Sequence, residues 1–180
     1  KKFLAVLLSV MLMATIFTAC TPQEKAPENQ DTDKDVSWEY IEEKKVLVVG
    51  LDDTFCPMGF RDQENNLIGF DIDLAKAVGE VLGVSVEFQP IDWKTKDMQL
   101  SSKRIDCIWN GMSATPDRQE SMSLSNKYLN NKIVVMSTKE DVKVSSTADL
   151  EDIKFGVQAE SAALEAVQAA DNFAAMEANM

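Results

Sequence analysis

Three short segments of this 180-residue chain gather side chains that could bind a small charged molecule. Residues 52–55 (DDTF) bring two carboxylates and a phenyl ring, and residues 90–93 (PIDW) bring a carboxylate and an indole. Residues 110–118 (NGMSATPDR) bring an amide, hydroxyl groups and a guanidinium. Acids, aromatic rings and an arginine in one place form a concave polar site better than they form a hydrophobic core. We therefore expect these segments to carry the function.

The third segment places an arginine where helix electrostatics disfavour it. Thr115 suits the N-cap of a helix and Pro116 its first position, so Arg118 falls in the first turn, near the positive end of the helix dipole. The unpaired N–H groups of that turn and the guanidinium together would bind a carboxylate. A surface ion pair of Arg118 with Glu120 or Asp117 explains this segment equally well, but the neighbouring strand ends favour the carboxylate receptor.

The other two segments could recognise the rest of a ligand. Phe55 and Trp93 could hold a flat or aliphatic group between two ring faces, although core packing is the commoner role of an aromatic residue after a strand. Asp52 and Asp53 would favour a ligand side chain with N–H donors or a positive charge. Solvation or helix capping is their alternative role.

Composition excludes several kinds of chemistry. The chain has no histidine, which rules out imidazole bases, histidine-dependent nucleophiles and histidine metal ligands. The formal net charge is −12, from 18 Lys and Arg against 30 Asp and Glu, and no basic cluster is present, so nucleic acid is not expected as a partner. Cys56 and Cys107 are expected to lie too far apart for a disulfide. No metal site or cofactor is implied.

Alternating strand and helix patterns position the three segments. Such an order indicates an α/β domain with a largely parallel sheet, whose ligands collect at the carboxyl ends of the strands. Each of the three segments follows a predicted strand. The expected elements are a buried strand at residues 46–50, a helix at 71–82, a strand at 84–88, a short helix at 94–101 and a strand at 105–109.

The pattern continues beyond residue 130 with fewer elements. Residues 132–136 predict a strand, 147–150 a helical turn, 153–157 a strand and 161–170 an Ala-rich helix. One strand–helix unit cannot enclose an apolar face of its own. We therefore divide the folded part into a first lobe, residues 38–132, and an incomplete second lobe, residues 133–180.

The N-terminal residues have the pattern of an export signal. Two lysines precede an uncharged, mainly apolar run over residues 3–19, and a small residue stands before Cys20. Residues 17–20 (FTAC) resemble the lipobox of bacterial lipoproteins, in which the cysteine is lipidated; an unlipidated signal with a chance cysteine is the alternative. We expect residues 1–19 to be a signal peptide and residues 20–37 a disordered, lipid-anchored linker.

Four segments together resemble one protein family. They are residues 46–60 (VLVVGLDDTFCPMGF), 67–74 (LIGFDIDL), 105–118 (IDCIWNGMSATPDR) and 123–135 (SLSNKYLNNKIVV). Through them, the chain resembles the extracytoplasmic solute-binding proteins, family 3 type, of polar amino-acid ABC transporters. The resemblance implies an α/β, periplasmic-binding-protein-like fold, in which two lobes close as a hinged trap. Members continue beyond the equivalent of residue 180, so it also implies a C-terminally truncated second lobe.

The resemblance implies roles for the first-lobe residues. Arg118 would bind the α-carboxylate of an amino acid, with help from the Ser113 backbone. The Gly111 carbonyl and the Ser113 hydroxyl would accept hydrogen bonds from the α-ammonium, and Asn110 belongs to the same ligand-binding motif.

Further roles concern the ligand side chain and the second lobe. Phe55 and Trp93 would enclose the side chain, and Asp52 would bind its polar end. In the second lobe, Ser161 and Ala162 match a family turn whose N–H groups donate to the carboxylate.

These roles imply a binding protein and not an enzyme. The expected function is the extracytoplasmic substrate-binding component of an amino-acid ABC transporter, which delivers a polar amino acid to the permease. A cationic or amide ligand such as arginine, lysine or glutamine suits the acids better than glutamate or aspartate would. We expect a monomer at the cell membrane, held there only by its lipid anchor, or in the periplasm if it is unlipidated.

Two other functions fit the same fold. Some exported proteins of this fold are dehydratases of cyclic acids that use carboxylates, and turnover of prephenate or arogenate would identify such an enzyme. The chain could also be the input domain of a sensor, which a membrane-spanning helix further along the chain would reveal.

Overall fold

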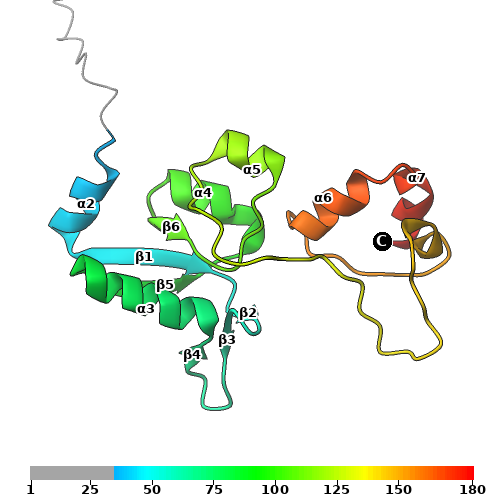
Figure 1. Cartoon of the computed structure of the whole chain (residues 1–180), viewed down its shortest axis with the longest axis horizontal. Coiled ribbons are helices and arrows are strands. Elements are labelled where there is room, and N and C mark those ends of the chain that lie inside the picture. Colours follow the sequence, from blue (N-terminus) through cyan, green and yellow to red (C-terminus); the bar gives the residue numbers. More distant parts are fainter. Residues whose placement is uncertain (1–34) are drawn as a thin grey trace, which may run out of the picture. The chain divides into compact units, whose positions relative to one another are not determined.

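The computed structural model describes residues 35–180 (Figure 1). The predicted signal peptide, Cys20 and most of the predicted linker lie outside the described residues. Within the described part, none of the helices has the length and apolar character needed to cross a membrane.

A three-stranded parallel sheet forms the centre of the first lobe. Strand β1 (Val46–Leu51) lies between β5 (Ser85–Pro90) and β6 (Cys107–Ile108), and both neighbours run parallel to it. All six residues of β1 pair with β5, whereas β6 pairs at only two positions. The predicted parallel sheet is therefore confirmed, with a third strand shorter than predicted.

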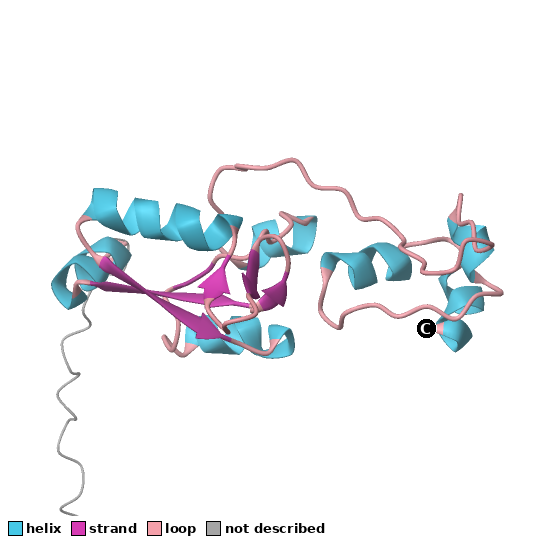
Figure 2. Cartoon of the chain, turned by 90° about the horizontal axis from the view of Figure 1, so that it is seen from below, coloured by secondary structure: helices cyan, strands magenta, loops and turns pink. Residues whose placement is uncertain are grey.

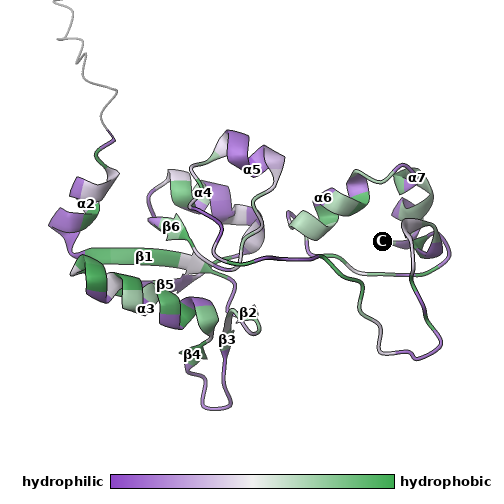
Figure 3. Cartoon of the chain, in the orientation of Figure 1, coloured by the Kyte–Doolittle hydropathy of each residue, from purple (hydrophilic) through white to green (hydrophobic). Residues whose placement is uncertain are grey.

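Helices on both faces explain why β1 is almost entirely apolar. Helix α3 (Phe70–Leu82) covers one face, and α4 (Lys96–Ser101), which follows the short η1 turn (Trp93–Thr95), covers the other (Figures 1 and 2). In Figure 3 most of β1 is coloured as hydrophobic. The side chains buried between these layers include Val49, Leu51, Ile72, Ala75 and Ile105, each at most 1% exposed.

Helix α3 ends where the sequence predicts and lies very close to the sheet. Gly83 takes a left-handed conformation, φ 70°, and its N–H bonds to the last turn, which ends the helix. Within α3, Gly79 faces β5, and a Cβ atom added there would overlap a methyl group of Val86 and lie 3.0 Å from the Val84 carbonyl oxygen. A side chain at this position would push the helix away from the strand.

Two parts of the first lobe were not predicted. Helix α2 (Ser37–Lys44) precedes β1, and its Lys44 bonds through Nζ to both carboxylate oxygens of Asp106, at 2.9 and 2.7 Å. A small antiparallel sheet follows β1 and is formed by β2 (Thr54–Phe55), β3 (Gly59–Arg61) and β4 (Leu67–Ile68). These strands have two or three residues each, too few for a clear alternating pattern.

Two predicted strands in the second lobe are wrong. Residues 132–136 and 153–157 form no strand in the structure, and Ile133 to Met136 are between 51% and 89% exposed. An apolar run becomes a strand only when another strand pairs with its backbone, and no described strand pairs with either run; the Phe155 N–H donates only to the Asn179 carbonyl, in η3. The predicted turn and helix are confirmed as η2 (Thr147–Leu150) and α6 (Ala162–Gln168), which α7 (Phe173–Met176) and η3 (Glu177–Asn179) follow.

Replacing Gly79 with alanine should destabilise the fold. Helix propensity alone would stabilise α3 by about 0.5–1 kcal/mol, but the overlap with Val86 should cost about 1–3 kcal/mol. The control Val81→Ala changes an 87% exposed side chain of the same helix and should leave stability nearly unchanged or slightly raised. Chemical denaturation of both variants measures the difference, and a more stable Gly79→Ala variant would contradict the packing described here.

Candidate functional site

The carboxyl ends of the three parallel strands meet at one edge of the sheet. The Asp52 backbone N–H, after β1, donates to Oδ1 of Asn110, after β6, at 3.1 Å. The Ile91 N–H, after β5, donates to the Leu51 carbonyl at 2.9 Å. Asn110 is only 4% exposed, so its amide holds two strand ends together from inside the structure. The three segments singled out from the sequence are therefore neighbours.

A hollow of about 270 Å³ opens beside this edge. Two of the predicted site residues, Asp52 and Trp93, line this hollow together with residues of the second lobe. Its lining residues are Asp52, Ile91, Asp92, Trp93, Lys94, Gln158 and Ala159.

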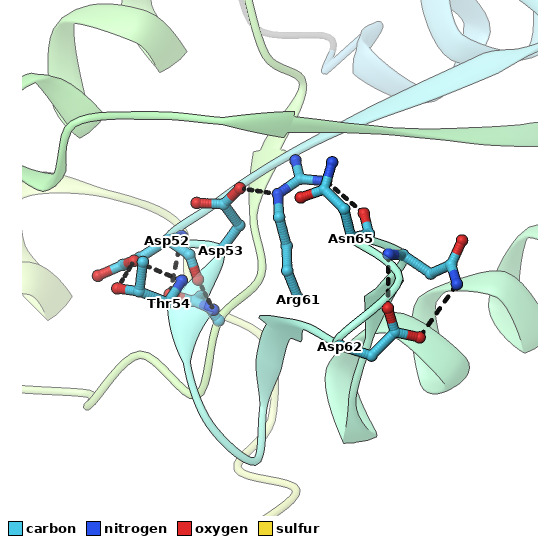
Figure 4. A network of polar contacts seen from close by, with 8 residues as sticks. Asp52, Asp53, Thr54, Arg61, Asp62 and Asn65 are labelled. Atoms are coloured by element: carbon cyan, nitrogen blue, oxygen red, sulfur yellow. Dashed lines mark hydrogen bonds and ion pairs between the residues drawn. The ribbon is translucent and has the colours of Figure 1, made fainter.

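The two neighbouring acids after β1 have different partners (Figure 4). Asp53 pairs with Arg61 Nε at 2.6 Å. Asp52 accepts hydrogen bonds from the Thr54 N–H and hydroxyl through Oδ1, and from the Gln158 amide through Oδ2 at 3.0 Å. Of these two acids, only Asp52 lines the hollow.

Arg118 is buried at the start of a helix, as the sequence predicts. Helix α5 (Pro116–Ser121) has Thr115 at its N-cap, and the arginine is 5% exposed. Its Nη1 donates to the Ser113 carbonyl at 3.1 Å. Its ion pair within the described residues is with Glu165 Oε1 of α6, at 3.1 Å from Nη2. The alternative partners weighed from the sequence, Glu120 and Asp117, do not pair with it.

One carbonyl of the second lobe joins two predicted site residues. The Glu160 carbonyl accepts from Trp93 Nε1 and from Arg118 Nη2, each at 3.1 Å. Glu160 has φ 57°, a left-handed conformation that favours glycine, so the chain turns sharply at this point. On the first-lobe side, Lys96 Nζ lies 5.8 Å from the centroid of the Trp93 ring, which helps to fix the indole.

The structure does not bring the two predicted aromatic residues to the same hollow. Phe55 is 45% exposed, and its ring lies beside the backbone of Gly111, where an added Cβ would be 3.3 Å from Phe55 Cε1. Trp93 lines the hollow and Phe55 does not. Gly111 has φ 58°, and both this conformation and the nearby ring suit a residue without a side chain.

The two predicted second-lobe residues form the start of α6. The Ser161 hydroxyl accepts from the Leu164 N–H at 3.1 Å and caps the helix, whose first residue is Ala162. Arg118 itself contacts two acceptors of the second lobe, the Glu160 carbonyl and the Glu165 carboxylate. Sequence reasoning missed Gln158 and Glu165 because their partners lie far along the chain.

A buried acid lies behind the motif that contains Gly111, and it was not among the predicted site residues. Asp71, in the first turn of α3, is 1% exposed and accepts from the Tyr128 hydroxyl at 2.9 Å. Burial raises the pKa of Asp71, although donors from Tyr128, Gly111 and Trp109 oppose this. Burial, and the bond to Asp71, raise the pKa of Tyr128 to about 12. The sequence signal that could have identified Asp71 is an acidic residue beside the apolar positions of the helix predicted at residues 71–82.

The site offers binding groups more than reactive ones. Within residues 35–180, no group of three or more Asp, Glu, Cys or His side chains could hold a metal ion. Cys56 and Cys107 are free thiols, and burial raises the pKa of Cys107 to about 12, so it stays protonated at neutral pH. The arrangement can bind an anion at Arg118 and a donor or cation at Asp52.

Replacing Asp71 with asparagine should change how stability depends on pH. Folding raises the pKa of Asp71 above its usual 3.8. The stability that this tighter proton binding gives the fold is therefore fully present below pH 3.8. This contribution is lost as the pH rises through the raised pKa. The free energy of unfolding of the wild type minus that of the variant should therefore fall with rising pH, as urea denaturation at a series of pH values would measure. A difference that grows with pH would contradict the raised pKa.

Known proteins resemble this chain in sequence. The cystine-binding protein TcyA of Bacillus subtilis is 30% identical over 83% of this chain, and the arginine-binding extracellular protein ArtP of the same organism is 29% identical over 88%. The chain spans 56% of the length of each relative.

Solved structures resemble it as well. An ancestral amino acid-binding protein, described as a precursor of cyclohexadienyl dehydratase, matches 73% of this chain and 60% of its own, with 34% identity and a TM-score of 0.65. A substrate-binding protein of an ABC uptake transporter from Streptococcus pneumoniae, solved with bound histidine, matches 51% of this chain and 37% of its own, with 47% identity and a TM-score of 0.50.

The family is established by a match over most of the chain. Residues 47–177 fit the sequence model of the bacterial extracellular solute-binding proteins, family 3, and this range contains all of the parallel sheet except Val46, the buried arginine and the hollow. The chain therefore belongs to the bacterial extracellular solute-binding proteins, family 3.

Proposed function

We propose that this chain is part of the extracytoplasmic substrate-binding component of an amino-acid ABC transporter, which binds a polar amino acid and delivers it to the permease. The observation that carries the proposal is the buried guanidinium of Arg118, which shares the Glu160 carbonyl with Trp93 of the hollow. A buried arginine needs an anionic partner; in the structure this is Glu165, and the α-carboxylate of an amino acid would take its place.

The rest of the site supports a ligand of amino-acid size. A hollow of about 270 Å³ lies slightly below the range of about 300–1,000 Å³ usual for drug-sized ligands. Asn110, Gly111 and Ser113 form the motif beside Arg118, where the proposed site for the α-ammonium lies. The Ser113 hydroxyl already accepts from the Asn131 amide at 2.8 Å, which fixes its orientation and leaves one lone pair for the ligand.

The charges around the hollow support a cationic or amide side chain. Asp52 presents its carboxylate there, whereas Asp53 is neutralised by Arg61. Asp92 adds a second acid and Lys94 one base to the lining. Relatives named for binding arginine and cystine, and the structure with bound histidine, support the class of polar amino acids.

The remaining assignments belong to the same proposal. Residues 1–19 would be removed as a signal peptide, and Cys20 would carry the lipid that holds the protein at the outer face of the membrane. Residues 20–37 would form the linker, residues 38–132 the first lobe and residues 133–180 part of the second. The protein would act as a monomer without catalysis, and failure to turn over prephenate or arogenate would separate it from a dehydratase.

Replacing Arg118 should remove amino-acid binding. Arg118→Ala should abolish measurable binding, and Arg118→Lys, which keeps the buried charge, should weaken it by about tenfold or more because an ammonium cannot form two parallel bonds to a carboxylate. The exposed Arg104 is a matched control, and Arg104→Ala should bind like the wild type. Titration calorimetry on folded variants, verified by circular dichroism, gives the affinities. Unchanged affinity in both Arg118 variants would refute the site.

Replacing Asp52 should change selectivity. Asp52→Asn removes the carboxylate that faces the hollow, so the affinity for arginine or lysine should fall about tenfold more than the affinity for uncharged amino acids. Asp53→Asn is the control: it also removes one negative charge, but from an acid that is already paired with Arg61. It should lower the affinity for every ligand only slightly and by the same factor. If Asp52→Asn lowers the affinity for every amino acid by the same factor, Asp52 does not recognise the ligand side chain.

A further inference from the structure

The guanidinium of Arg118 is already occupied by acceptors of the chain itself. Nη1 donates to the Ser113 carbonyl, and Nη2 is 3.1 Å from both the Glu160 carbonyl and Glu165 Oε1. Two of these three acceptors come from the second lobe. An amino-acid carboxylate cannot approach Nη2 while both remain in place.

The same stretch of the second lobe covers the other proposed ligand groups. Gln158 donates to Asp52, and the Glu160 carbonyl accepts from Trp93. Residues 158–165 therefore contact, through one continuous segment, the group proposed for the ligand carboxylate and two groups proposed for its side chain. Atoms of the chain thus make the contacts that the proposed ligand would make.

Glu165 is chemically equivalent to the group that it would replace. Its side chain ends in a carboxylate, as the ligand backbone does, and either carboxylate can accept charge-assisted bonds from a guanidinium. The side chain of Glu165 is 35% exposed, so its carboxylate can be hydrated after displacement. The side chain of Arg118 is 6% exposed, so its charge needs the ligand carboxylate as a replacement partner. The exchange of one carboxylate for another keeps the buried charge neutralised throughout.

We propose that Glu165 is an affinity-setting residue, which occupies Arg118 in the ligand-free chain and must be displaced by the carboxylate of the incoming amino acid. This inference rests on the proposed function. Because every amino acid carries the same α-carboxylate, Glu165 lowers the affinity for all of them by a similar factor. Selectivity between side chains stays with Asp52 and the hollow.

The local structure favours this role for Glu165. It lies in the first turn of α6, where its N–H donates to the Ser161 carbonyl at 3.1 Å and the helix dipole stabilises an acid. The left-handed turn at Glu160 directs the chain so that its carbonyl and the Glu165 carboxylate face the same guanidinium. These contacts tie residues 158–165 to Asp52, Trp93 and Arg118 of the first lobe.

The test compares Glu165→Gln with Glu120→Gln in the full chain. Glu120 is an exposed acid of α5, in the same helix as Arg118, and forms no ion pair within the described residues, so its variant controls for the loss of one negative charge. Titration calorimetry with arginine, lysine and glutamine gives the affinities. Hydrogen exchange of residues 156–168 without ligand measures the contact itself, independently of binding.

The expected result has two parts. Glu165→Gln should bind all three amino acids about three- to tenfold more tightly than the wild type, and by the same factor for each. Its backbone amides at residues 156–168 should exchange faster without ligand. Glu120→Gln should match the wild type in both measurements, and Glu165→Ala should change in the same direction as Glu165→Gln.

Other results overturn the inference in distinguishable ways. Unchanged or weaker binding by Glu165→Gln, while the wild type binds, would show that Glu165 does not compete with the ligand. Faster exchange with unchanged affinity would show a contact that does not oppose binding. If the wild type and every variant bind no amino acid although hydrogen exchange shows them folded, the proposed function itself fails. A side-chain-dependent gain in affinity would make Glu165 a selectivity residue and refute the role proposed here.

Discussion

A buried guanidinium has to meet acceptors at all times, and this constraint organises the site. Arg118 is 5% exposed, and leaving such a charge unpaired would cost several kcal/mol, about 3–5 in comparable cases. The Ser113 carbonyl accepts from it within the first lobe; in the second lobe the Glu160 carbonyl accepts another hydrogen bond and the Glu165 carboxylate neutralises the charge. The same arginine therefore connects the two lobes and defines where an anionic ligand would bind.

The parallel sheet provides the rigid base for this arrangement. β1 is paired over its whole length and covered by α3 and α4, so the strand ends that carry Asp52, Ile91 and Asn110 are held together by backbone and amide hydrogen bonds. The buried Asp71 and its partner Tyr128 support the motif at Gly111 from the other side. The second-lobe groups that we propose to change partners on binding belong to residues 158–165, and a rigid base with a movable part is usual in proteins that close around ligands.

The parallel sheet and helices α3 and α5 of the first lobe could be predicted from the sequence because local signals decide them, whereas α2 and the short strands β2 to β4 could not. An apolar run at residues 46–50, a helical pattern ending at Gly83 and Pro116 at the first position of α5 each indicate their element with little help from distant residues. The second lobe depends on partners, so residues 132–136 resemble a strand but have no pairing strand among the described residues. The same reason hides Glu165, because nothing near it in the sequence indicates that it meets an arginine 47 residues earlier.

The most direct test of the central claim is a thermal-shift screen against the twenty amino acids, using the chain from residue 20 onward with Cys20 replaced by serine. A ligand that binds only the folded state raises the unfolding midpoint. We predict a selective rise with a cationic or amide amino acid such as arginine, lysine or glutamine. A cooperative unfolding transition that no amino acid shifts, even at millimolar concentration, would contradict the claim that this sheet edge is an amino-acid site.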